Sequence, residues 1–129
     1  MGNFNQSERR AHTRFRVKEG AFAVIKEQQD TKITVGQVID ISEGGLAFKY
    51  MAKSEPVKAD HKLDIYFSGQ GIQLKDISFR IISDFGIESS ITFSPIFMRR
   101  GCLQFQKLTQ THRDQLDKFI QKYTDVDKN

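Results

Sequence analysis

Hydrophobic and polar residues alternate along most of this chain, and a period of two is typical of β-strands with one buried face. The segments with this pattern, or with a short β-prone apolar run, are 21–25, 33–41, 46–50, 63–67, 77–81 and 103–105. Gly44 and Gly45 separate two of these segments, and Gly69 and Gly71 bracket another turn. Several short strands separated by glycine turns predict an antiparallel β-barrel or sandwich.

The strand predicted at 33–41 carries apolar residues at both odd and even positions. We expect Val35, Ile39 and Ile41 to lie on the core face, and Val38 and Asp40 to lie on the opposite face. In that arrangement the side chain of Asp40 points away from the core at the end of the strand.

The period changes only near the C-terminus. Four apolar residues there follow the spacing i, i+3, i+4 and i+7 of one helix face: Leu116, Phe119, Ile120 and Tyr123. Thr109 or Thr111 can cap this helix, and Thr111 with Asp114 has the spacing of a capping box. The pattern therefore predicts an antiparallel barrel followed by one C-terminal helix.

The segment between Asp84 and Arg100 is long and apolar. Its apolar residues are Phe85, Ile87, Ile91, Phe93, Ile96, Phe97 and Met98. We interpret it as an extra hairpin packed on the barrel. The alternative is an exposed surface that binds a partner or a second subunit.

Composition indicates one soluble globular domain. The chain has 129 residues, of which 38% are hydrophobic and 28% charged, and its net charge is +4. Most of the distinctive charge lies between positions 8 and 18, where five basic residues accompany a single acid: Arg9, Arg10, Arg14, Arg16 and Lys18, with Glu8. A basic segment of this kind suits an anionic ligand, although the same residues also occur as a solvated tail.

The remaining reactive residues argue against enzymatic and metal chemistry. Cys102 is the only cysteine, so no internal disulfide can form, and a reducing compartment is expected. His12, His61 and His112 lack metal-ligand spacing to each other or to Cys102, and we predict that they are surface residues. No nucleotide-binding or nucleophile motif of an enzyme occurs. We therefore predict a non-enzymatic protein. Because neither a secretion signal nor a membrane-spanning apolar run is present, we also predict that it is cytoplasmic.

Two short motifs carry candidate binding chemistry. Arg10-x-x-x-Arg14 offers planar guanidinium groups that bind phosphates or guanine edges. Asp40-x-Ser42-x-x-Gly45 places a carboxylate and a hydroxyl at a strand end, where they can bind one planar base. Either motif also has a structural interpretation, as a basic tail or as a hairpin turn with side-chain-to-backbone hydrogen bonds.

Taken together and in this order, the two motifs resemble those of the PilZ family. The resemblance covers the chain from about Glu8 to Tyr123 and implies a six-stranded antiparallel β-barrel with a C-terminal α-helix. It divides the chain into a flexible N-terminus at 1–8, a PilZ-like domain at 9–125 and a polar tail at 126–129.

The resemblance implies cyclic di-GMP as ligand and no other cofactor. Arg10 and Arg14 match family residues that bind phosphate and the Hoogsteen edge of guanine, Asp40 matches the residue facing guanine N–H donors, and Arg9 suits a second, stacked ligand molecule. The complete predicted binding set is Arg9, Arg10, Arg14, Asp40, Ser42, Gly44 and Gly45. No catalytic residue and no metal ligand is predicted.

Signalling without catalysis requires a surface that differs when ligand is bound. We expect ligand to order residues 1–16 across the barrel, so that an unidentified protein partner binds the changed surface. One alternative is a ligand-independent PilZ-like adaptor that works through protein contacts alone. A general nucleic-acid-binding barrel is a weaker alternative, because the aromatic residues follow the core pattern and the basic residues concentrate in one segment.

Overall fold

The computed structural model describes residues 13–26, 33–52, 62–87 and 97–125 of the chain. Its elements are β1 (Phe15–Arg16), β2 (Ala21–Lys26), β3 (Ile33–Ile41), β4 (Gly45–Ala52), β5 (Lys62–Phe67), β6 (Gly71–Ile87), β7 (Phe97–Gln106) and α2 (Gln110–Tyr123). A strand lies at each of the six predicted segments, and the helix lies where the change of period predicts it.

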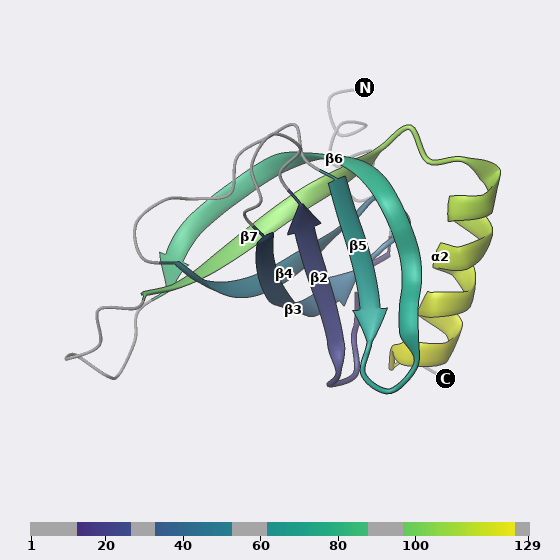
Figure 1. Ribbon diagram of the computed structural model, residues 1–129, viewed down its shortest axis with the longest axis horizontal. Coiled ribbons are helices and arrows are strands. Elements are labelled where there is room, and N and C mark those ends of the chain that lie inside the picture. The colour runs from purple at the N-terminus through teal and green to yellow at the C-terminus, as the bar shows by residue number, and fades with distance from the viewer. Residues whose placement is uncertain (1–12, 27–32, 53–61, 88–96, 126–129) are drawn as a thin grey trace, which may run out of the picture.

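Six of the strands form a closed barrel. Neighbouring strands follow the order β3-β2-β5-β6-β7-β4, and β4 pairs back onto β3. All of these pairings are antiparallel. Figure 1 shows β6 and β7 as long strands that curve around the barrel, with α2 beside it. The predicted six-stranded antiparallel barrel with a C-terminal helix is confirmed.

Inward-facing apolar residues fill the barrel, as the alternation predicts. In β4, Leu46, Phe48 and Tyr50 are buried while Lys49 between them is exposed. Burying large apolar side chains contributes roughly 1.5–3 kcal/mol each relative to exposure. This packing makes the barrel a rigid scaffold for groups on its outer surface.

Helix α2 buries the whole predicted stripe against the barrel. The buried residues are Leu116, Phe119, Ile120 and Tyr123, and the ring of Tyr123 stacks on Phe67 with centroids 4.0 Å apart. The cap is at Thr109, whose hydroxyl accepts from the His112 amide at 3.0 Å. The Thr109 amide in turn donates to Nδ1 of His112 at 3.3 Å.

The Thr111–Asp114 capping box is therefore a wrong prediction. With the cap at Thr109, His112 stands at the third helical position, and its Nε2 also lies 2.8 Å from the Lys75 carbonyl oxygen on β6. This contact joins residues that are distant in sequence, so the residues around the helix start do not predict it. It also gives His112 a structural role at the helix start.

The faces of β3 differ from the prediction. Val38 and Ile41 are 2% and 0% exposed, whereas Val35 is 54% exposed and Ile39 is half-buried. The pairing of β3 with β4 shifts register between Val38 and Asp40, which marks a β-bulge. Because a bulge adds one residue to a strand, it reverses the faces of the residues beyond it. Asp40 still lies at the strand end, with its side chain half-buried.

The apolar segment after Asp84 continues the barrel strands. β6 extends to Ile87 and β7 starts at Phe97, with Ile87 paired to Met98. In the described residues it is therefore an extension of β6 and β7, and the predicted separate hairpin is wrong to that extent. Beyond a register shift between Ile81 and Ser83, the two strands stay paired as far as Ile87 and Met98. Residues 88–96 lie outside the described residues.

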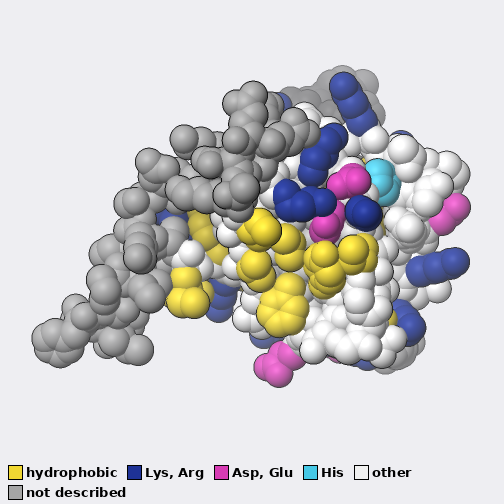
Figure 2. All heavy atoms as spheres, viewed as in Figure 1, with side chains coloured by type: hydrophobic (Ala, Val, Ile, Leu, Met, Phe, Trp, Pro, Cys, Tyr) yellow, Lys and Arg dark blue, Asp and Glu magenta, His cyan; other side chains and the backbone are white. Residues whose placement is uncertain are grey.

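The outer surface of β2, β5 and β6 carries both apolar and charged groups. Figure 2 shows hydrophobic side chains gathered in the middle of this face, with charged side chains grouped beside them. Phe22 and Ile72 are 39% and 44% exposed. Lys26 Nζ lies 2.9 Å from Asp64 Oδ2 and 3.0 Å from Asp76 Oδ1. Among the described residues, no helix is long and apolar enough to cross a membrane.

Candidate functional site

The end of β3 holds the first candidate group, Asp40. The short strand β1 pairs with β3 there, with Arg16 opposite Asp40 and Phe15 opposite Ile41. The Val17 amide adds a hydrogen bond to the Ile39 carbonyl at 2.9 Å. Backbone pairing thus fixes the chain that follows the arginine motif directly beside Asp40.

Asp40 and Arg14 form an ion pair on the barrel surface. Arg14 Nη1 lies 2.9 Å from Asp40 Oδ1, and the two side chains are 59% and 20% exposed. The residues come from the two separate sequence motifs, 26 positions apart. An exposed guanidinium–carboxylate pair contributes little to stability, roughly 0–1 kcal/mol.

A second arginine, Arg100, also faces Asp40. Its Nη2 lies 3.6 Å from Asp40 Oδ2, and its side chain is 30% exposed. Sequence reasoning missed this residue. The adjacent pair Arg99–Arg100 before the last strand was the only available signal, and it does not say which arginine faces outward. The register of β4, β7 and β6 decides this by pairing Arg100 with Lys49 and Phe85.

Arg99 lies on the opposite face of β7 from Arg100, and its contacts hold this strand in place. Its Nε donates to Asp84 Oδ1 at 2.8 Å and its Nη2 donates to the Asp84 carbonyl at 3.2 Å. The Tyr50 hydroxyl donates a short hydrogen bond to the same carboxylate. The pKa of the Arg99 guanidinium is raised, chiefly by its hydrogen bond to Asp84. This cluster fixes β7 against β4 and β6, so Arg100 is held outward.

The rest of the second motif forms a tight turn. The Ser42 amide donates to the Gly45 carbonyl at 2.8 Å, and the Gly44 amide donates to Ser42 Oγ at 3.1 Å. Ser42 is only 6% exposed. The hairpin-turn interpretation of Ser42 therefore describes the contacts that its hydroxyl makes here. Ligand contacts of Ser42, Gly44 and Gly45 stay a prediction.

Gly45 is required by a close approach of two strands. A Cβ at this position would lie 2.0 Å from the Leu103 carbonyl oxygen on β7. The adjacent Phe105 amide donates to the Gly44 carbonyl at 2.8 Å. The glycines thus let the turn sit against β7, which brings the Asp40 side of the motif close to Arg100.

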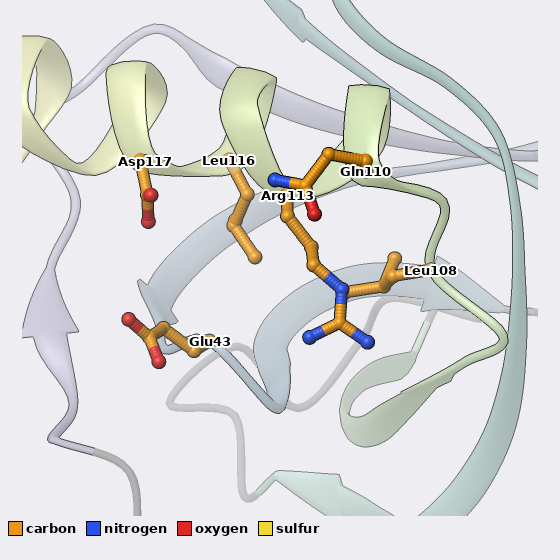
Figure 3. A pocket seen from close by; sticks show the side chains of 6 residues that line it. All are labelled: Glu43, Leu108, Gln110, Arg113, Leu116 and Asp117. Carbon is orange, nitrogen blue, oxygen red and sulfur yellow. The ribbon is translucent and has the colours of Figure 1, made fainter.

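A pocket of about 270 Å³ lies beside the same turn. Its lining residues are Glu43, Leu108, Gln110, Arg113, Leu116 and Asp117. Figure 3 shows Arg113 reaching into it from α2, while the carboxylates of Glu43 and Asp117 lie together at its other side. The pocket therefore joins the motif turn to the helix, and its mixed charges select no single ligand class.

Arg9, Arg10 and His12 lie outside the described residues, so the structure says nothing of the first half of the arginine motif. Cys102 is half-buried on β7, in agreement with a strand residue. Within the described ranges, no group of three or more His, Cys, Asp or Glu side chains could hold a metal ion.

Comparison with solved structures finds the same fold in known proteins. The PilZ domain with c-di-GMP of YcgR from Escherichia coli aligns with a TM-score of 0.67 and 15% identity, covering 89% of this chain and 91% of that one. The MrkH–c-di-GMP complex of K. pneumonia aligns with a TM-score of 0.65 and 16% identity, covering 87% of this chain and 51% of that one. The chain thus spans about half of MrkH.

No curated protein matches the chain in sequence. The model of the PilZ domain family, by contrast, matches residues 8–122, which include both motifs and the whole described barrel. The chain belongs to the PilZ domain family.

Proposed function

We propose that this chain is a non-enzymatic receptor for cyclic di-GMP. The observation that carries the proposal is the 2.9 Å ion pair between Arg14 and Asp40, which brings the two motifs together on one face of the barrel. Family membership supports the same ligand, since the solved PilZ domain of YcgR and the MrkH complex both contain c-di-GMP.

In the proposed site, the ligand replaces the ion pairs between Asp40 and the arginines. Ligand phosphates compete for the guanidinium groups of Arg14 and Arg100, because phosphate oxygens accept charge-assisted hydrogen bonds from the same planar fork. The Asp40 carboxylate can then accept hydrogen bonds from the ring and exocyclic N–H groups of guanine. A carboxylate repels phosphate, so Asp40 selects for a base and the arginines select for the anion.

Ordering of the N-terminal arginine segment is the second part of the proposal. Because Phe15 and Arg16 are paired with β3, we assign the ligand-dependent change to the residues before Thr13. Ordering about ten residues costs on the order of 10 kcal/mol of backbone entropy, so closure requires both phosphates and both bases of the ligand. A protein partner would then bind the closed segment together with the barrel beside it.

Isothermal titration with cyclic di-GMP, GMP, cyclic AMP and a single-stranded oligonucleotide tests the receptor. We expect micromolar or tighter binding of cyclic di-GMP, weakened by salt, and weak binding of GMP. No heat change and no NMR shift near Asp40 at saturating cyclic di-GMP would leave the ligand-independent adaptor in its place. Equal binding of the oligonucleotide would instead favour a general nucleic-acid barrel.

A further inference from the structure

The outer surface beside Asp40 continues as a row of cross-strand neighbours. Phe85 on β6 pairs with Arg100 on β7, and Arg100 pairs with Lys49 on β4. Directly paired residues share one face of a sheet, so these three side chains stand next to one another. Arg100, the middle member of the row, links it to the candidate site, because its Nη2 lies 3.6 Å from Asp40 Oδ2.

Phe85 is the unusual member of this row. Its aromatic ring is 49% exposed beside two cationic side chains. Its neighbour Asp84 is turned inward, where it binds Arg99 at 2.8 Å and Tyr50. Since successive strand residues alternate faces, that buried anchor holds Phe85 outward. The ring is therefore presented at the surface by a fixed backbone rather than by a loop.

We propose that Phe85 and Arg100 form a second subsite of the ligand face, where Phe85 stacks on one guanine and Arg100 contacts a phosphate. The inference rests on the proposed receptor function. A single carboxylate at Asp40 recognises the hydrogen-bonding edge of one base, whereas cyclic di-GMP carries two bases and two phosphates. The other base needs a flat apolar surface beside a cation, which is the combination that base-stacking proteins use.

The absence of tryptophan from the chain allows a direct test. In Phe85→Trp the introduced indole is the only one in the protein, so its fluorescence reports on position 85 alone. We expect cyclic di-GMP to quench this fluorescence in parallel with the heat measured by titration, while affinity stays within about three-fold of wild type, because indole is also a stacking surface.

The matched control is Phe22→Trp. Phe22 is also exposed, at 39%, and lies in the same circumferential row, reached from Lys49 through Gln37. It lies on β2, two strands from β6 by the shorter way around the barrel. Its row meets β6 at Ile72 through Tyr66, far along the strand from Phe85, so we expect no quenching there. Quenching at both positions would show general contact with the nucleotide and would overturn the assignment to Phe85.

Alanine variants give the second readout. We expect Phe85→Ala and Arg100→Ala each to weaken cyclic di-GMP by roughly ten-fold, and Phe85→Leu to weaken it as well because it keeps apolar bulk without a stacking face. Lys75→Ala, the same charge change on β6 at an exposed position, should leave affinity unchanged. Melting temperatures of all variants confirm folding.

The outcomes separate this inference from the receptor proposal. Wild-type binding with loss in Arg14→Ala, but no quenching at position 85 and unchanged affinity in Phe85→Ala and Arg100→Ala, overturns the subsite and leaves the receptor intact. No binding of cyclic di-GMP by the wild type overturns both. If Phe85→Trp fails to fold, the affinities of the leucine and alanine variants decide.

Discussion

The two ends of the motif from Asp40 to Gly45 have different roles in this protein. Ser42 and Gly45 use their polar groups and their lack of bulk within the turn and against β7. Among the described residues, Asp40, two residues before Ser42, forms its ion pairs with Arg14 and Arg100, which come from other parts of the fold. We call Ser42 and Gly45 the structural end of the motif. We call Asp40 the reversible end, because in the proposed function the ligand displaces its arginine partners. Sequence proximity in a motif therefore does not imply a shared role.

The largest expected effect tests the structural end. Gly45→Ala places a Cβ against the Leu103 carbonyl oxygen, and we expect a loss of about 3 kcal/mol in the free energy of unfolding. Urea denaturation measures it. Gly86→Ala is the matched control, because a Cβ there meets nothing within 4 Å. Equal stability of the two variants would contradict the close approach of the turn to β7.

Arg14 tests the reversible end. Its side chain is 59% exposed, so Arg14→Ala should change the melting temperature very little. We expect it to weaken cyclic di-GMP by about 2–3 kcal/mol, because it removes charge-assisted hydrogen bonds. Titration calorimetry and thermal melting together check this. A clearly lower melting temperature with unchanged affinity of the folded variant would show that Arg14 belongs with the structural end.

Asp40 is expected to separate base recognition from anion binding. Asp40→Ala should weaken cyclic di-GMP by about 1.5–2 kcal/mol, since guanine N–H groups lose their acceptor. Pyrophosphate should bind the variant at least as well as the wild type, because Arg14 and Arg100 lose a competing carboxylate. Titration with both ligands makes the comparison. A parallel loss for both would mean that Asp40 only positions the arginines.

Ser42 should have a smaller effect, on stability. Ser42→Ala removes the acceptor for the Gly44 amide, and we expect a loss of about 1 kcal/mol in unfolding free energy. A loss of ligand affinity larger than that of Asp40→Ala, with stability unchanged, would move Ser42 to the reversible end. Urea denaturation and titration of the same preparation decide between them.

The smallest effect concerns the ion pairs on β2, β5 and β6. The hydrogen bond from Lys26 lowers the pKa of Asp76 below its ordinary value of 3.8. A carboxyl with a depressed pKa stabilises the fold above its unfolded pKa and loses that contribution as pH falls through the folded pKa. Lys26 has a raised pKa, chiefly through its hydrogen bond to Asp64, so its contribution is lost only as pH rises through a folded value above 10.5.

Asp76→Asn should therefore destabilise the protein by only about 0.5 kcal/mol at neutral pH, because the pair is exposed. Asparagine tolerates the left-handed backbone at this position, where φ is 58°. The difference from wild type should vanish as pH falls below 3.8. Denaturation across pH measures this, and a difference that persists in acid would point to backbone strain instead of charge. Ligand affinity should not change.

The sequence alone determined the barrel strands and the helix stripe. Alternation at Leu46, Phe48 and Tyr50 reports the inward face of β4 directly, because the period of an extended chain is set by covalent geometry. The helix stripe follows in the same way from 3.6 residues per turn. The two candidate motifs were also readable, because the residues of each are close together in sequence. Their ligand contacts stay a prediction.

Only the tertiary structure decided the faces of β3, the role of Ser42 and the place of Arg100. The bulge at Val38–Asp40 depends on the pairing of β3 with β4, and the His112 cap depends on a contact with Lys75 from β6. Arg100 meets Asp40 through the register of β3, β4 and β7, and β7 is distant in sequence from the other two strands. Local periodicity fixes which residues alternate, but strand register is a long-range choice made by packing. That choice brings the two arginines to one carboxylate.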